Sequence, residues 1–172
     1  APVPLCNFST VAPAHINNDG RIDALVMGSV GNDRLVRVLV NTSRFSGMPF
    51  SEGDSASIPA ADNGDAAWAD SDGDGDMDFV IAGVSLTGAK GSLMLNDGNG
   101  RFTDAGAGLT PLFFSSCAWG DVDADGDPDL FMMGQTGFPS NTVTSILYLN
   151  QGGNVFTPIP TALPALQHGD AA

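Results

Sequence analysis

The chain has 172 residues, and the 42 % that are hydrophobic suffice for the core of a folded domain. Its 6 basic and 20 acidic residues give a net charge of −14, which argues against nucleic acid or an anionic membrane surface as partner. The longest apolar runs are too short to span a bilayer, and 22 glycines with 11 prolines disfavour a helical bundle.

Three similar segments follow one another along the chain. They read PAHINNDGRIDALVMG at 13–28, WADSDGDGDMDFVIAG at 68–83 and WGDVDADGDPDLFMMG at 119–134. The second and third lie 51 residues apart and share a Trp, five Asp, a Gly, an apolar stretch and a closing Gly. The first is a weaker match and lies 55 residues before the second. A fixed period of this length indicates a repeat architecture.

Each segment is followed by further strand-like features. Apolar runs that end in Asn occur at 35–41, 93–96 and 146–150, and the last two are followed by Asn-x-Gly-x-x-x-Phe, a hairpin signal. Each unit is therefore expected to contain four short antiparallel strands, which is typical of a β-propeller blade. We predict an all-β fold of about three four-stranded antiparallel blades, forming a partial propeller or part of a larger or oligomeric one.

The repeat defines a single propeller segment over residues 1–172, with a further blade expected to open at its end, because the last four residues repeat the four before Trp68. Blades bury their faces against neighbours, so three blades leave two open flanks. We expect these flanks to be covered by the remaining blades of a larger propeller or by copies of this chain. The expected bounds are about 5–60, 61–111 and 112–162 for the three blades and 163–172 for the opening of the next.

The second and third segments each contain a loop with carboxylates at positions 1, 3, 5, 7 and 9. Carboxylates at alternate positions, with a Gly at position 6 for a sharp turn, wrap oxygens around one hard cation. An all-oxygen donor set favours Ca²⁺ over zinc or copper, and a flexible shell favours it over Mg²⁺. We therefore predict two Ca²⁺ ions, one held by Asp70, Asp72, Asp74, Asp76 and Asp78 and the other by Asp121, Asp123, Asp125, Asp127 and Asp129.

An EF-hand is the nearest competing site, but it requires a bidentate Glu at position 12, where this chain has Ile81 and Met132. Position 9 is therefore expected to close the ligand shell. Position 7 is expected to bind through its backbone carbonyl, which makes the side chains of Asp76 and Asp127 secondary. The competing interpretation is that both acidic loops only favour solubility or tolerance of salt.

The first segment contains a degraded version of the loop. It has His15 at position 1, and its formal charge falls from −5 to about −1. A third Ca²⁺ site here would use Asn17, Asp19, the carbonyl of Arg21 and Asp23. The alternative is that Asn17 and Asp19 hold the turn by hydrogen bonds from side chain to backbone, without a metal.

The pattern WxDxDxDGDxD, followed by an apolar trio with Gly and then by an apolar pair with LNxGxxxF, resembles the FG-GAP/VCBS repeat. That repeat builds the calcium-bearing blades of integrin α-subunit propellers and of many secreted adhesins and lectins. The resemblance covers about residues 5–172 and departs from the pattern at Pro13 and His15. It implies a secreted or cell-surface scaffold for binding or adhesion, without catalytic machinery.

We therefore predict an integrin-like, calcium-binding extracellular propeller segment that binds a protein partner. Two alternatives are a propeller lectin that binds glycans and a purely structural module that Ca²⁺ stabilises within a larger assembly. The loops at 29–34, 84–91 and 135–144 differ in length and chemistry, whereas a repeated sugar site would need similar loops. The sequence has no nucleophile elbow, phosphate loop or dinucleotide fingerprint, so an enzyme is not predicted.

Two residue pairs carry further predictions. Trp68 and Trp119 are expected to pack blade against blade rather than to stack on a sugar. Cys6 and Cys117 occupy different positions on blades one and three. Because a disulfide requires Cα atoms within ~7 Å, we predict that these two thiols are not bonded to each other.

Overall fold

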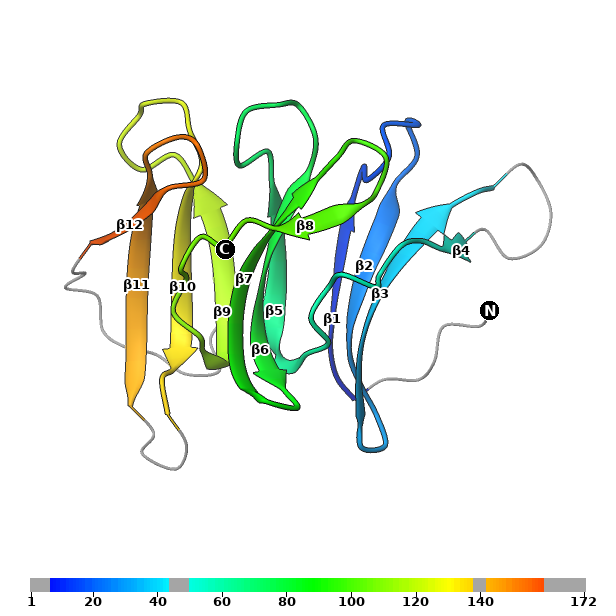
Figure 1. Cartoon of the computed structure of the whole chain (residues 1–172), viewed down its shortest axis with the longest axis horizontal. Coiled ribbons are helices and arrows are strands. Elements are labelled where there is room, and N and C mark those ends of the chain that lie inside the picture. Colours follow the sequence, from blue (N-terminus) through cyan, green and yellow to red (C-terminus); the bar gives the residue numbers. More distant parts are fainter. Residues whose placement is uncertain (1–6, 44–49, 138–141, 160–172) are drawn as a thin grey trace.

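A computed structural model describes residues 7–43, 50–137 and 142–159 of the chain. Within these ranges the chain forms twelve strands and no helix, and so has no helix there that could cross a membrane. The strands form three four-stranded antiparallel sheets, which stand side by side in Figure 1 and do not close into a ring. The predicted all-β fold of three four-stranded, blade-like sheets is confirmed.

We call the three sheets blade 1, blade 2 and blade 3, in chain order. Blade 1 contains β1 (Asn7–Ala14), β2 (Asp23–Val30), β3 (Asp33–Asn41) and β4 (Phe50–Glu52). Blade 2 contains β5 (Asp62–Ala69), β6 (Asp78–Ser85), β7 (Gly88–Asn96) and β8 (Phe102–Asp104). Blade 3 contains β9 (Phe113–Gly120), β10 (Asp129–Gln135), β11 (Val143–Asn150) and β12 (Phe156–Ile159). The expected opening of a further blade at 163–172 lies outside the described residues.

Blade 2 lies between the other two, so both of its faces are covered. Alternate side chains of each strand point to opposite faces and therefore reach both neighbouring blades. Phe79 and Ile81 join the core shared with blade 1, whereas Val80 and Ala82 join the core shared with blade 3. All four side chains are fully buried. Burial of Phe79 or Ile81 contributes roughly 1.5–3 kcal/mol to stability relative to exposure. The two cores therefore hold the neighbouring blades together.

The two tryptophans connect neighbouring blades. The indole N–H of Trp68 donates to the Ala12 carbonyl of blade 1 at 3.0 Å, and that of Trp119 donates to the Ala67 carbonyl of blade 2 at 3.0 Å. The ring of Trp68 also packs against Phe79, with centroids 4.9 Å apart. The predicted role of these tryptophans in packing blade against blade is confirmed.

The thiol of Cys117 belongs to the core between blades 2 and 3. It is buried and free, and desolvation raises its pKa. Cys6 lies outside the described residues. The absence of a bond between the two thiols therefore stays a prediction.

Candidate metal centre

Three loops of related sequence join the first and second strands of the blades, at the same end of each sheet (top of Figure 1). We call them loop 1 (15–22), loop 2 (70–77) and loop 3 (121–128). In loop 2 the chain turns through Gly73 and Gly75, whose φ angles of 75° and 93° are left-handed and suit glycine. Side chains before and after the turn are therefore brought back toward the start of the second strand.

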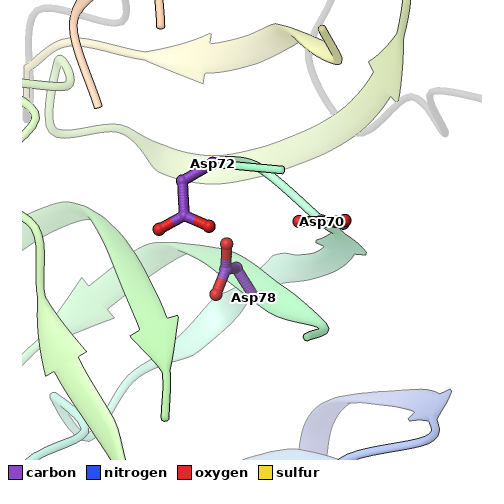
Figure 2. Close-up of side chains that lie close together, drawn as sticks. All are labelled: Asp70, Asp72 and Asp78. Atoms are coloured by element: carbon purple, nitrogen blue, oxygen red, sulfur yellow. The ribbon is translucent and has the colours of Figure 1, made fainter. Parts of the chain in front are cut away.

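Loops 2 and 3 each gather three carboxylates. Asp70, Asp72 and Asp78 place one oxygen each within 4.8 Å of the others, and Asp121, Asp123 and Asp129 do the same. Figure 2 shows the carboxylates of Asp72 and Asp78 turned toward each other, with that of Asp70 beside them. Ca²⁺ binds oxygen at about 2.3–2.6 Å, so oxygens at this separation can ligate one ion. These are positions 1, 3 and 9 of the predicted pattern.

One oxygen in loop 2 is buried without a partner. Asp70 Oδ2 accepts a hydrogen bond from the Gly75 N–H at 3.1 Å, whereas its Oδ1 is buried and has no hydrogen-bond partner. A buried carboxylate oxygen without a donor is costly, since it has lost water and gained nothing. A cation among the three carboxylates would supply the missing interaction. The residues present in loop 2 therefore fit Ca²⁺.

The electrostatics of both loops indicate an uncompensated negative charge. Desolvation and the neighbouring Asp74 carboxylate raise the pKa of Asp72, and desolvation and the Asp125 carboxylate raise that of Asp123. The pKa of Asp78 is also raised, mainly by its burial. Within the described residues, none of the ion pairs formed by arginine includes a carboxylate of either cluster. A divalent cation would stabilise the charged form of all three groups.

The carboxylate at position 9 has a second task that the sequence did not reveal. Asp78 Oδ2 accepts hydrogen bonds from the Ser71 N–H at 3.0 Å and the Ser71 hydroxyl at 2.6 Å, and Oδ1 accepts from the Asn96 N–H at 2.8 Å. Asp129 receives the same two backbone N–H groups from Val122 and Asn150, at 2.8 and 2.9 Å. Position 9 therefore fixes the start of the loop to the end of the third strand, whatever else it binds.

Positions 5 and 7 stand outside the clusters of three. Asp74 Oδ1 accepts from the Asp76 N–H at 2.9 Å, and Asp125 Oδ1 accepts from the Asp127 N–H at 2.9 Å. The Asp76 carboxylate lies against Gly98, where a Cβ would come within 2.5 Å of it, and accepts from the Asn18 side chain of loop 1. The structure thus brings together three of the five carboxylates predicted as ligands in each loop.

Loop 1 has the same backbone arrangement without the acidic cluster. Asp23 accepts from the Ile16 N–H at 3.0 Å and from the Asn41 N–H at 2.7 Å, as position 9 does in the other loops. His15 Nδ1 lies 2.9 Å from the carbonyl of Arg21 and must donate to it. The Arg21 guanidinium pairs with Asp19 and donates to the Asn41 carbonyl at 2.6 Å.

Side-chain hydrogen bonds hold the turn of loop 1, and Asp72 and Asp74 make the same pair of bonds in loop 2. Asn17 Oδ1 accepts from the Asp19 N–H at 3.3 Å, and Asp19 Oδ1 accepts from the Arg21 N–H at 2.9 Å. These are the turn-holding hydrogen bonds that sequence analysis gave as the alternative to a third Ca²⁺. Among the residues that the structure describes, His15, Asp19 and Asp23 do not form a metal-holding group.

Sequence analysis missed the function of the Asn that ends the third strand of each blade. Asn41, Asn96 and Asn150 were interpreted only as the ends of strands and the starts of hairpins. In the structure the backbone N–H of each binds the position-9 Asp of its own blade. The signal was present as an Asn at the same place in all three units.

Comparison with known proteins identifies part of the chain. Residues 70–132, which include both acidic clusters, match the family model described as FG-GAP-like repeat. The match extends from Asp70 of loop 2 to the middle of β10. No curated protein matches the chain. The resemblance that the motifs predicted is therefore confirmed for this stretch.

Proposed function

We propose that this chain, whose residues 70–132 form an FG-GAP-like repeat, is a calcium-binding interaction module of the β-propeller type. The observation that carries the proposal is the pair of three-carboxylate clusters, one of which contains the buried, unpartnered Oδ1 of Asp70. We assign one Ca²⁺ to Asp70, Asp72 and Asp78 and one to Asp121, Asp123 and Asp129.

A bound Ca²⁺ supplies a positive charge and several oxygen-binding positions. The chain supplies the rest: a Gly turn that curls the loop, two carboxylates from the loop, and a third on the first residue of β6 or β10. The backbone N–H groups that bind Asp78 and Asp129 orient these carboxylates before any ion arrives. The function of the ion is therefore to hold an acidic loop against its sheet.

We infer a secreted or cell-surface location. FG-GAP repeats are typically extracellular, and extracellular calcium modules work with dissociation constants of about 10⁻⁴–10⁻³ M. Sites with three carboxylates at the sheet end and a largely exposed loop are suited to that range rather than to cytosolic concentrations. The acidic, nearly lysine-free composition agrees with a solvated exterior.

The outer flank of blade 3, the face that points away from blade 2, has features that favour a protein partner or further blades. Position 2 of loops 1 and 2 is buried beneath the next blade, since Ile16 is 0 % and Ser71 is 2 % exposed. Val122 is the same position in loop 3 and is 56 % exposed. By strand alternation Phe131 and Leu147 face the same side, away from blade 2. We propose that this apolar flank is covered by another protein surface, either the remaining blades of a propeller or a copy of this chain.

The module is proposed to bind and position other proteins rather than to catalyse a reaction. A purely structural role, in which Ca²⁺ stabilises blades within a larger assembly, is the main alternative, because recurring Trp and Asn side chains donate across the joints between blades. Pull-down with the calcium-loaded chain, compared with a Val122→Lys variant, separates the two. A partner lost in the variant supports binding by this flank, and self-association lost in the variant supports assembly.

Calcium titration of the chelator-treated chain tests the metal proposal. We expect two ions per chain by calorimetry and a higher melting temperature in calcium than in chelator. An equal concentration of Mg²⁺ is the control, since Mg²⁺ demands a more regular shell and should raise the melting temperature less. Fewer than two ions, or the same melting temperature with calcium and with chelator, would contradict it.

A further inference from the structure

A single asparagine side chain connects the two acidic loops. Asn150 ends β11 of blade 3 and is fully buried. Its side-chain N–H groups donate to the Ser71 carbonyl of loop 2 at 2.8 Å and to the Pro128 carbonyl of loop 3 at 3.2 Å. Its side-chain oxygen accepts from the Gly152 N–H at 3.1 Å, which fixes the orientation of the amide.

On the loop 2 side, the contact reaches the peptide between two proposed ligands. Ser71 lies between Asp70 and Asp72, and its carbonyl receives Asn150. The N–H and hydroxyl of the same serine both donate to Asp78, the third ligand. Ser71 is thus held from both sides, by a proposed ligand of its own loop and by the neighbouring blade.

On the loop 3 side, the same asparagine contacts a proposed ligand directly. The Asn150 backbone N–H donates to Asp129 Oδ1 at 2.9 Å. Pro128, whose carbonyl receives the side chain, immediately precedes Asp129. Asn150 therefore forms a direct hydrogen bond to Asp129, beside loop 3. It forms another to the Ser71 carbonyl, which lies between the proposed ligands Asp70 and Asp72 of loop 2.

We propose that Asn150 couples the two cation sites, so that an ion in one loop raises the affinity of the other loop. This inference rests on the proposed binding of Ca²⁺ by both loops. An ion that ties Asp121 and Asp123 to Asp129 stabilises the hydrogen bond between Asp129 and Asn150, and Asn150 in turn holds the Ser71 carbonyl. The second ion then meets a loop that has already lost part of its freedom, which gives positive and reciprocal coupling.

The joint between blades 1 and 2 is a natural control. Asn96 makes the same contacts, donating to the Ile16 carbonyl at 2.8 Å, to the Met77 carbonyl at 3.1 Å and through its backbone to Asp78. Loop 1, however, has His15 and Asn17 at positions 1 and 3, where the other loops have two of their three clustered carboxylates. The same side chain therefore connects two cation sites at one joint and only one at the other.

Charge repulsion between the two ions acts against this coupling. It is long-range and screened, with a Debye length of about 8 Å at 0.15 M salt, whereas a buried hydrogen bond is hardly screened. Measurements at that ionic strength therefore favour the contribution of Asn150. Repeating them at higher salt separates the two effects, because only the repulsion weakens.

The test compares calcium binding by the full chain with binding by single-site variants. Asp123→Ala leaves the loop 2 site, and Asp72→Ala leaves the loop 3 site. For independent sites, the two-ion association constant of the unmodified chain equals the product of these two single-site constants, and for coupled sites it exceeds the product. All three measurements are repeated with Asn150→Ala and, as the matched control, with Asn96→Ala.

We expect the two-ion constant to exceed the product roughly two- to tenfold, the worth of one buried hydrogen bond. The excess should persist with Asn96→Ala and disappear with Asn150→Ala. No excess in the unmodified chain, or an equal excess with Asn150→Ala, overturns the coupling while leaving the calcium sites intact. Absence of calcium binding in the unmodified chain overturns the proposed function and this inference with it.

A second measurement needs no change at Asn150, in case that variant does not fold. Amide hydrogen exchange is followed at Gly75 in loop 2, at saturating calcium, in the unmodified chain and in Asp123→Ala. Loss of the loop 3 ion should speed exchange in loop 2 at least twofold if the coupling exists. Unchanged exchange at Gly75 contradicts it.

Discussion

Loop 1 and loop 2 have the same backbone conformation, but their negative charges are compensated differently. In both, the Asp at position 9 accepts one N–H from position 2 and one from the Asn that ends the third strand. Loop 2 then concentrates carboxylates and leaves Asp70 Oδ1 buried without a partner. Loop 1 pairs Asp19 with the guanidinium of Arg21 from the same loop.

The comparison separates what folds the loop from what the loop binds. Because loop 1 makes the same hydrogen bonds with Arg21 and His15 in place of two carboxylates, this conformation depends on the position-9 aspartate and its two backbone donors rather than on the number of carboxylates. The carboxylates at positions 1 and 3 are an addition to that frame. A loop of this kind can therefore gain or lose carboxylates, and with them a proposed cation site, without losing the blade.

The largest effect should follow from removing the position-9 aspartate, which holds the loop through two backbone N–H groups. Asp23→Ala leaves the buried N–H groups of Ile16 and Asn41 without acceptors and should destabilise the chain by about 2–5 kcal/mol. Denaturant unfolding with and without calcium measures this loss. Calcium should not restore it, because loop 1 has no cluster, and Asp19→Ala, on the exposed side of the loop, is the milder control. Restoration of stability by calcium would contradict this expectation, because it would show that loop 1 holds an ion even without Asp23.

The next effect concerns position 3, where loop 1 has Asn17 and loop 2 has Asp72. Asp72→Ala removes a proposed ligand and should weaken calcium binding at loop 2 at least tenfold, or about 1.4 kcal/mol. Asn17→Ala is the same position in loop 1 and should leave calcium binding unchanged. Asp76→Ala is a second control, since its carboxylate faces Asn18 and Gly98. Equal losses for Asp72→Ala and Asp76→Ala would contradict the three-carboxylate site.

Much of the blade pattern was predictable because the residues that recur are those that join the blades. Trp68 and Trp119 recur because each donates to the preceding blade, and the apolar trios recur because they fill both cores. The acidic loops were recognisable from spacing alone. Which three carboxylates would meet was only partly predictable, because spacing does not reveal the other hydrogen-bond donors that a carboxylate finds in the fold. Asp76, for example, bonds to Asn18, 58 residues away in sequence.

A smaller, pH-dependent effect should come from loops 2 and 3. Burial and neighbouring carboxylates raise the pKa of Asp72 and Asp123, and burial raises that of Asp78. The folded, metal-free chain therefore holds these protons more tightly than the unfolded chain. The stability they contribute is complete below the ordinary value of 3.8 and is lost as the pH rises through the raised values.

Melting temperatures measured in chelator from pH 3.8 upward should show this decline, and saturating calcium should abolish it. Asp97 shifts the other way, because the Asn99 N–H lowers its pKa. Asp97 is not part of either cluster, so its contribution is the same with and without calcium and cancels in the difference. The same pH profile in calcium and in chelator would mean that the clusters do not hold the ion.

The smallest effect should come from removing the Arg21 guanidinium of loop 1. Arg21→Ala removes the ion pair with Asp19 and the hydrogen bond to the Asn41 carbonyl, both near the surface. Partly exposed pairs contribute little, so the loss should be about 1 kcal/mol or less and equal with and without calcium. Calorimetry on the same variant decides whether Arg21 stands in for an ion. If the variant still binds two ions per chain, loop 1 is a metal-free version of the motif. If it binds a third, the guanidinium has been blocking a site that loop 1 keeps in spite of His15 and Asn17 at positions 1 and 3.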